Sequence, residues 1–479
     1  MTLFNNAKWV AFSQVFKIFV QLVNIVYLAR LIAPSEYGIM AMALVVVNFG
    51  NLIRDLGTAA AIIQRKEIND NLINAVFWLN VFMGLSIALI IAGGSPFISE
   101  FFHQPKLTPV LLLLALIFPI SSSASAHLAL LERDSRFKQI AFIEISSSLV
   151  SVVIALFMAY KGYGVYSLVF QAIILNAMSS IQLWRSSRWR PALSKIFDMG
   201  ELKKIFGFSA NLSIFNFLNY FTRNADNIII GRFMTDAILG AYSLAYRVML
   251  FPLQTLTFVA GRSLFPILSK HQDDNDKIRN TYLNCVFVIL CLVVPLMTGL
   301  ALLREPFVLL VFGKEWTLTG EILLWLAPTA ILQSVLSTSG TVFMAKGRTD
   351  LLMTLGILSM ILQVSAFIIG VQYNIIIFAK LYFIANLINF MPAMHYLMKI
   401  INGRLTDIIK KCYAIFIADI FMIICIVAFD KVITVDNAYI NLISNVVIGM
   451  LSFSLMLVIC SRQVRQKIGL NFRKRIIND

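Results

Sequence analysis

The sequence has few charged residues and no long hydrophilic segment. Lys, Arg, Asp and Glu make up only 13% of the 479 residues, about half of their share in a soluble domain. The loops between the apolar runs are too short to form a soluble catalytic domain. These absences exclude a soluble enzyme and predict a polytopic membrane protein.

Cysteine and recognisable catalytic motifs are also scarce. The five cysteines all fall within apolar runs, so we expect no disulfide and no metal site. The sequence contains no phosphate-binding glycine motif and no nucleophile elbow. We therefore expect no cofactor and no enzymatic activity.

The apolar runs predict about fourteen transmembrane helices. Hydrophobic residues make up 59% of the chain, and the mean hydropathy is +0.83. A helix of about 20 apolar residues crosses a hydrocarbon core of about 30 Å, whereas strands of a membrane barrel alternate every second residue. The predicted spans cover residues 9–32, 38–63, 72–92, 108–131, 140–160, 165–184, 205–231, 238–266, 280–303, 318–344, 351–371, 375–398, 406–429 and 439–460. The predicted fold class is an all-α polytopic membrane protein.

The net charge of +16 indicates the orientation in the membrane. Most Lys and Arg lie in the N-terminal segment, the even-numbered loops and the tail, and basic loops stay in the cytoplasm. We therefore expect both termini in the cytoplasm. The densest basic segments, 185–204 and 462–475, are typical of contacts with anionic membrane lipids. Because no recognised nucleic-acid module surrounds them, we expect no nucleic-acid partner.

A polar stripe runs along the first predicted span and recurs in the seventh. In the first copy the residues are spaced i, i+3, i+7 and i+10, so they share one face of a helix. They are Gln14, Lys17, Gln21 and Asn24. The residues 202 positions later are also polar: Asn216, Asn219, Arg223 and Asp226. The segments that follow end alike, at Gly38 and Gly240, so the sequence predicts an internal duplication.

The duplication predicts two pseudo-symmetric six-helix lobes followed by two more helices. Six spans separate the copies, so they are parallel and their symmetry axis is expected along the membrane normal. Pro119 and Pro328, in the fourth and tenth spans, are candidate hinges because proline removes a helical hydrogen bond. The predicted organisation is an N-lobe over 1–190, a basic cytoplasmic linker over 191–204, a C-lobe over 205–400, helices thirteen and fourteen over 401–461 and a basic cytoplasmic tail over 462–479.

Ionisable residues inside the spans are the candidate functional residues. A charge at the bilayer centre costs at least about 2.5–3.5 kcal/mol, so each one needs a partner or water. The acidic residues Asp55, Asp226 and Asp419 are candidates for coupling to protons or sodium. The alternative is that these charges form interhelical pairs that fix the packing, with Arg223 paired to Asp226 and either Arg54 or Lys17 paired to Asp55. For three residues close to span ends, Arg262, Glu144 and Lys380, we expect the side chain to extend to the membrane surface.

The stripes and the cations together indicate a water-filled central cavity with excess positive charge. Such a cavity suits an anionic solute, and phosphate is the obvious group. The candidate cavity residues are Gln14, Lys17, Gln21, Asn24, Arg54, Asn216, Asn219, Arg223 and Arg247.

Several short motifs within the first 400 residues resemble one family. They include LARLIAPSEYG from Leu28, RDLG from Arg54, NADNIIIGR from Asn224 and VFGKEW from Val311. As a set they are similar to Wzx-type polysaccharide flippases, and most similar to the colanic-acid exporter branch of the multidrug/oligosaccharidyl-lipid/polysaccharide (MOP) superfamily.

The resemblance implies both a fold and a substrate. The fold is two six-helix lobes plus helices thirteen and fourteen. The substrate is an undecaprenyl-pyrophosphate-linked oligosaccharide, moved across the bacterial inner membrane by alternating access coupled to H⁺ or Na⁺. The implied partners are this lipid-linked sugar, membrane lipids and polysaccharide assembly proteins.

Two other functions stay open on the sequence alone. A multidrug or cation antiporter of the same superfamily is expected to have twelve helices and an acidic cavity. A membrane polysaccharide polymerase is expected to carry a long outward loop.

Overall fold

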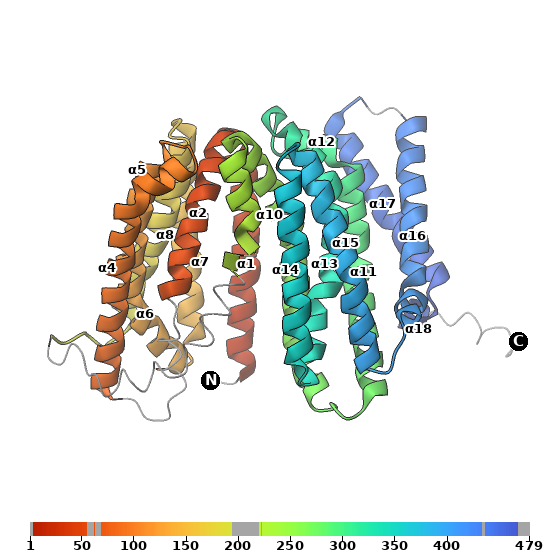
Figure 1. Ribbon diagram of the computed structural model, residues 1–479, viewed down its shortest axis with the longest axis horizontal. Helices are drawn as coiled ribbons and strands as arrows, with labels where there is room; N and C mark the ends of the chain where they lie inside the picture. The colour runs from red at the N-terminus through yellow and green to blue at the C-terminus, as the bar shows by residue number, and fades with distance from the viewer. Residues whose placement is uncertain are drawn as a thin grey trace, which may run out of the picture. The chain divides into compact units, whose positions relative to one another are not determined.

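A computed structural model describes residues 3–54, 62, 69–193, 220–221, 223–433 and 436–467. Within these ranges the side chains of 3–11, 15, 252–263, 266, 462–463 and 467 are not described. The described chain is almost entirely α-helical (Figure 1). It divides into two compact units, Met1–Gly240 and Ala241–Asp479, which are treated separately below.

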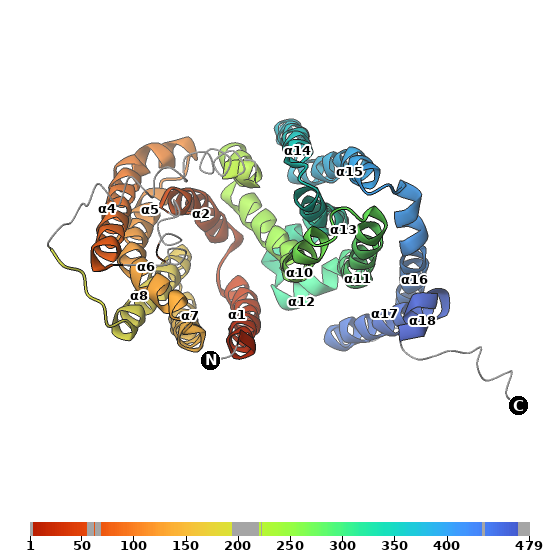
Figure 2. The ribbon, with the colours of Figure 1, turned by 90° about the horizontal axis from the view of Figure 1, so that it is seen from below.

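The first unit is built from long apolar helices joined by short turns. Five of its helices pack each against the next, in the order α4, α6, α8, α7 and α1, as Figure 2 shows. The helices are α1 (Leu3–Leu31), α2 (Pro34–Arg54), α4 (Asp70–Phe101), α5 (Leu107–Ala115), α6 (Ile117–Arg133), α7 (Phe137–Tyr160) and α8 (Val165–Ser186). Residues 220–233 are helical wherever they are described, and α10 (Asp236–Ser269) begins near the end of this unit.

Side-chain caps begin several helices. The Asn69 side chain accepts a hydrogen bond from the Leu72 amide at the start of α4, and the Asp274 side chain accepts one from the Lys277 amide. Such caps satisfy amides that have no partner within the helix, so they define where a helix begins. At these two helices the start is therefore specified locally by one polar residue after a short loop.

The span that contains Pro119 is interrupted. It consists of α5 and α6 with a break at Leu116, where the Leu116 amide donates to Leu113 instead of to the residue four positions earlier. The proline lies three residues beyond this break and lacks an amide for the Ala115 carbonyl. Pro328, by contrast, lies inside an uninterrupted helix, α13 (Thr317–Ala345).

The second unit is organised around α13. The helix packs along α11 (Asn275–Leu302) on one side and α15 (Ile375–Ile400) on the other, and α14 (Thr349–Gly370) packs on α15. A core of buried apolar side chains joins α10, α11, α13 and α15 to α16. The remaining helices of this unit are α12 (Arg304–Val311), the 3₁₀ turn η1 (Lys314–Trp316), α16 (Leu405–Val432), α17 (Ala438–Cys460) and α18 (Arg462–Lys467).

Helices α16 and α17 are the two predicted additional helices. They pack closely along each other, and α16 also packs on α11 (Figure 1). The Asn445 side chain of α17 donates to the carboxylate of Asp430 on α16, with a distance of 2.7 Å. The pair is thus joined by a polar contact near its turn as well as by apolar packing.

The structure confirms the predicted fold class, an all-α polytopic membrane protein. Within the described residues, 12 helical segments are long and apolar enough to cross a membrane. Predicted spans 205–231 and 238–266 are not among them, so the count of fourteen is not confirmed. The predicted domain boundaries stay predictions, and most of the predicted linker lies outside the described residues.

The first turns of α2 and α10 cross in backbone contact at two glycines. A Cβ on Gly38 would lie 1.8 Å from the carbonyl oxygen of Asp236, and one on Gly240 would lie 1.8 Å from that of Pro34. Only a residue without a Cβ fits so close to another backbone. Pro34 and Asp236 are 202 residues apart, as are the two glycines, so the two contacts are reciprocal. The crossing therefore joins the two segments that the sequence predicts to be copies of each other.

Polar contacts hold the turns around this crossing. The Glu36 carboxylate accepts from the Lys106 ammonium at 2.8 Å and from the Val165 amide at 2.9 Å. The hydrogen bond and the charge of Glu36 raise the pKa of Lys106 above its ordinary value. Gln104 donates to the side chain of Asp236 at 2.9 Å. These contacts connect the starts of α2, α5, α8 and α10.

Replacement of Gly38 by alanine tests the crossing. We expect Gly38→Ala to lower the stability by at least about 1–3 kcal/mol, because the added methyl overlaps a carbonyl and forces the helices apart. The measurement is the midpoint of thermal unfolding of the purified protein.

The control is Gly356→Ala in α14, where an added Cβ meets no atom within 4 Å. Alanine there is expected to be neutral, or to stabilise the helix by about 0.5–1 kcal/mol. A wild-type midpoint for Gly38→Ala would contradict the close crossing.

Candidate functional site

The polar stripe of α1 faces polar residues on α7 and α8. The Lys17 ammonium forms an ion pair with Glu144 of α7, with 2.8 Å between Nζ and Oε2. Seven residues later, the amide of Asn24 donates to Oε1 of Gln171 on α8 at 3.4 Å. Lys17 and Asn24 of the stripe therefore contact two neighbouring helices of their own unit.

The ion pair between Lys17 and Glu144 is accessible. Their side chains are 34% and 38% exposed, respectively. A pair this exposed stabilises a fold by only about 0–1 kcal/mol. Facing hydrocarbon it would carry a large desolvation cost, so the exposed side of the pair requires water. The other two members of the stripe, Gln14 and Gln21, are also exposed.

Glu144, which was expected to extend to the membrane surface, has its carboxylate engaged by Lys17 of α1. An opposite charge at this distance favours the ionised form of the carboxyl group. The expectation that Glu144 reaches the membrane surface stays a prediction. Lys380, for which the same was expected, lies with its ammonium 5.5 Å from the centre of the Trp325 ring.

A second set of polar contacts joins α7 and α8. The Ser146 hydroxyl donates to Oε1 of Gln182 at 2.8 Å, and the Gln182 amide donates to Ser147 at 3.1 Å. Sequence reasoning missed these residues, although a signal was present. Gln171 and Gln182 are eleven residues apart, about three turns, so they share one face of α8. A search for polar periodicity in the fifth and sixth spans would have found them.

Arg54 lies at the end of α2 and donates from Nη1 to the hydroxyl of Ser121 on α6. Ser121 belongs to a run of serines that follows Pro119 in the sequence. In the same helix, Ser125 accepts from the Asn80 amide of α4 at 2.8 Å. The first turns of α6 therefore supply hydroxyl groups to neighbouring helices at the place where the span is interrupted.

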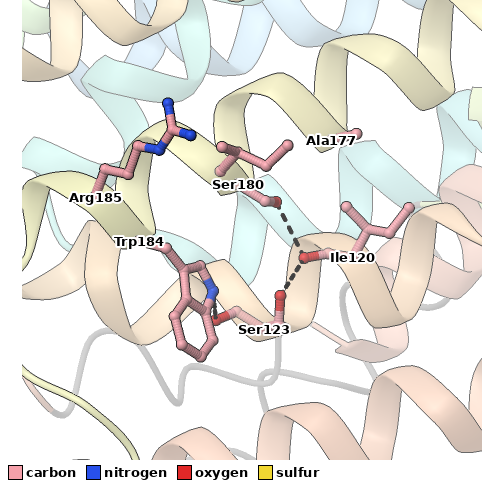
Figure 3. A pocket seen from close by; sticks show the side chains of 7 residues that line it. Ile120, Ser123, Ala177, Ser180, Trp184 and Arg185 are labelled. Carbon is pink, nitrogen blue, oxygen red and sulfur yellow. Dashed lines mark hydrogen bonds between the residues drawn. The ribbon is translucent and has the colours of Figure 1, made fainter.

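A groove of about 480 Å³ lies between α6 and α8. Figure 3 shows the hydroxyls of Ser123 and Ser180 directed at the carbonyl of Ile120, at 2.7 and 3.0 Å. The Trp184 indole donates to the Ser123 carbonyl at 3.0 Å. The groove walls are mainly apolar, and Arg185 is the charged residue that lines it.

The structure describes two of the remaining candidate cavity residues, Arg223 and Arg247. Arg223 is exposed, and Arg247 is partly buried within α10. Asn216 and Asn219 lie outside the described residues. Their predicted role in one central cavity stays a prediction.

The structure describes two of the three candidates for ion coupling, Asp226 and Asp419. Asp226 is 3% exposed and accepts from the Asn227 backbone amide at 2.7 Å. Asp419 on α16 accepts from the Thr298 hydroxyl of α11 at 3.0 Å, and its other carboxylate oxygen is buried without a hydrogen-bond partner. Asp55 lies outside the described residues. Their role in ion coupling stays a prediction.

Known structures share this fold. The lipid II flippase MurJ, in an inward closed conformation, aligns with a TM-score of 0.74 at 15% identity, covering 96% of this chain and 99% of MurJ. An inward-facing multidrug resistance MATE family transporter of the MOP superfamily aligns with a TM-score of 0.58 at 14% identity, covering 80% and 95%. This chain therefore shares the fold of these two proteins.

Sequence comparison identifies the family. Residues 27–320 match the model of the polysaccharide biosynthesis protein family. The chain belongs to this family, which confirms the resemblance drawn from its motifs.

Relatives in three bacteria extend the similarity. The teichuronic acid biosynthesis protein TuaB of Bacillus subtilis (strain 168) is 28% identical over 475 residues, 97% of each chain. The lipopolysaccharide biosynthesis protein WzxC of Escherichia coli (strain K12) is 28% identical over 370 residues, 77% of this chain and 75% of WzxC. The succinoglycan biosynthesis transport protein ExoT of Rhizobium meliloti (strain 1021) is 26% identical over 322 residues, 67% and 65%. These relatives support the expectation of a transporter in polysaccharide biosynthesis instead of an enzyme.

Thiol labelling tests whether the α1 stripe faces water. In a variant without the five native cysteines, we expect Gln14→Cys and Gln21→Cys to react with a membrane-impermeant maleimide. A thiol in hydrocarbon reacts slowly because its thiolate is disfavoured. Phe19→Cys is the control, because Phe19 is an apolar residue of the same helix with 62% exposure. Equal labelling at Phe19 and at the stripe would contradict a wet stripe.

Proposed function

We propose that the protein translocates an undecaprenyl-pyrophosphate-linked oligosaccharide from the cytoplasmic to the periplasmic leaflet of the bacterial inner membrane. Membership of the polysaccharide biosynthesis family and similarity to WzxC and ExoT support this substrate class. The observation that carries the proposal is the partly exposed side chain of Lys17, halfway along a mainly apolar helix that also carries the exposed Gln14 and Gln21. An accessible cation at that depth suits a phosphate that must pass through the membrane.

The proposed binding mode separates the parts of the substrate by their chemistry. Lys17, Arg54 and Arg247 supply positive charge to the pyrophosphate, because charge-assisted hydrogen bonds to phosphate oxygens are strong. Amide side chains hydrogen-bond the sugars, while the polyprenyl chain stays in the bilayer. The candidates for contact with the sugars are Gln14, Gln21, Asn24, Asn216 and Asn219.

The proposed cycle is alternating access, with the two halves of the chain rocking around the substrate. Pro119 and Pro328 are the candidate hinges, and the helix break at Leu116 supports the first of them. Coupling to a proton or sodium gradient is assigned to Asp55, Asp226 and Asp419. The uncompensated oxygen of Asp419 supports this role, because it is available to a proton or a cation.

The proposed setting follows from charge and family. Both termini face the cytoplasm, and the basic segment after α8 contacts anionic lipids. Contacts with polysaccharide assembly proteins would hand the translocated unit to polymerisation.

Substitution of Lys17 or Arg54 tests the cationic binding site. In a strain that depends on this protein for surface polysaccharide, we expect Lys17→Ala or Arg54→Ala to reduce the polysaccharide at least tenfold. A tenfold loss corresponds to about 1.4 kcal/mol, which lies within the range of a charge-assisted hydrogen bond. The amount of protein in the membrane should be unchanged.

Lys17→Arg is the matched control and should retain export, because it keeps the charge and the donor. Normal export by both alanine variants would contradict a cationic site. A multidrug antiporter would instead give normal polysaccharide and altered drug resistance on deletion of the gene. If the protein were a polymerase, deletion of its gene would leave single repeat units at the periplasmic face. Deletion of the gene for the proposed flippase leaves them at the cytoplasmic face.

A further inference from the structure

The ion pair between α1 and α7 lies within a polar environment. Lys17 is followed by the exposed Gln21 one turn later. Glu144 is followed on α7 by Ser147, which accepts from Gln182 of α8. The pair is thus bordered by hydrogen-bonding groups on each of its two helices and is reached from its exposed side.

The geometry leaves donors available on Lys17. An ammonium has three N–H donors, and one of them is engaged by Oε2 of Glu144. With 34% of the side chain exposed, a ligand can reach the ammonium without separation of the helices. The contact is therefore suited to exchange of one anion for another.

Glu144 is not accounted for by the proposed function. Its charge opposes the attraction of a phosphate to Lys17, since it neutralises the cation at close range. A cation that served only to attract phosphate would bind the phosphate more tightly if no carboxylate were paired with it. A role purely in packing is also weak, because an exposed ion pair holds two helices together poorly.

We infer that Glu144 is the resident counter-ion of Lys17, which the phosphate of the substrate displaces on binding and which displaces the phosphate on release. The inference rests on the proposed function and adds the residue that limits the affinity. A pyrophosphate presents more acceptor oxygens and more negative charge than one carboxylate, so it competes for the ammonium. Return of Glu144 then prevents the headgroup from remaining bound.

Binding of a short isoprenyl pyrophosphate tests this exchange. The full-length protein in lipid nanodiscs is titrated with farnesyl pyrophosphate, and farnesol serves as the ligand without phosphate. We expect Glu144→Gln to lower the dissociation constant of farnesyl pyrophosphate at least threefold, and Lys17→Ala to raise it at least tenfold. The neutral amide keeps the shape of Glu144 but no longer competes for the ammonium.

The controls separate exchange from structural damage. Lys106→Ala removes the cation of another ion pair with the same 2.8 Å separation, outside the helices, and should leave the dissociation constant unchanged. Lys17→Gln serves in place of Lys17→Ala should the alanine variant unfold. Thermal unfolding of each variant shows whether a change in affinity reflects loss of the fold.

The outcomes distinguish this inference from the proposed function. Opposite changes in affinity for the Glu144 and Lys17 variants support exchange. Equal or weaker binding by Glu144→Gln, together with phosphate-dependent binding by the wild type, overturns the counter-ion role alone. Failure of the wild type to prefer farnesyl pyrophosphate over farnesol overturns the proposed phosphate recognition as well.

Discussion

A charged side chain in the middle of a membrane helix must have an opposite charge or water beside it, and this constraint governs the first unit. Lys17 meets it through Glu144, and the exposed side of the pair requires water. The orientation of α1 follows, because turning its stripe toward lipid would strand the ammonium. Asn24 and Gln171 continue the same polar contact further along the helix. These polar groups thus determine which face of α1 is turned toward α7 and α8.

A second constraint acts where α2 and α10 begin. Gly38 and Gly240 allow two backbones to approach within a distance that excludes any side chain. Each glycine faces the carbonyl of the first residue of the other helix, so the two contacts are reciprocal. The ion pair of Glu36 with Lys106 and the bond from Gln104 to Asp236 hold the neighbouring turns. The two segments that the sequence predicts to be copies of each other thus supply the two sides of a tight crossing.

The helices were predictable from sequence because an apolar run of sufficient length forms a helix that spans the bilayer. Predicted span 375–398, for example, is α15 over Ile375–Ile400, begun by the side chain of Asn374. The stripe was also predictable, since Gln14 and Lys17 follow helical periodicity. The partner of Lys17 was not, because Glu144 is 127 residues away and periodicity does not report which helices are neighbours. The glycine crossing escaped prediction for the same reason.

The central claim is that this protein carries a pyrophosphate-linked oligosaccharide through the membrane, with the phosphate held at Lys17. The most direct measurement uses liposomes that contain the purified protein and a fluorescent isoprenyl-pyrophosphate oligosaccharide in both leaflets. An impermeant reductant added outside irreversibly bleaches only the outer-leaflet signal in protein-free liposomes. The account predicts nearly complete bleaching with the wild type and the protein-free value with Lys17→Ala. Bleaching by the wild type at the protein-free value would contradict it.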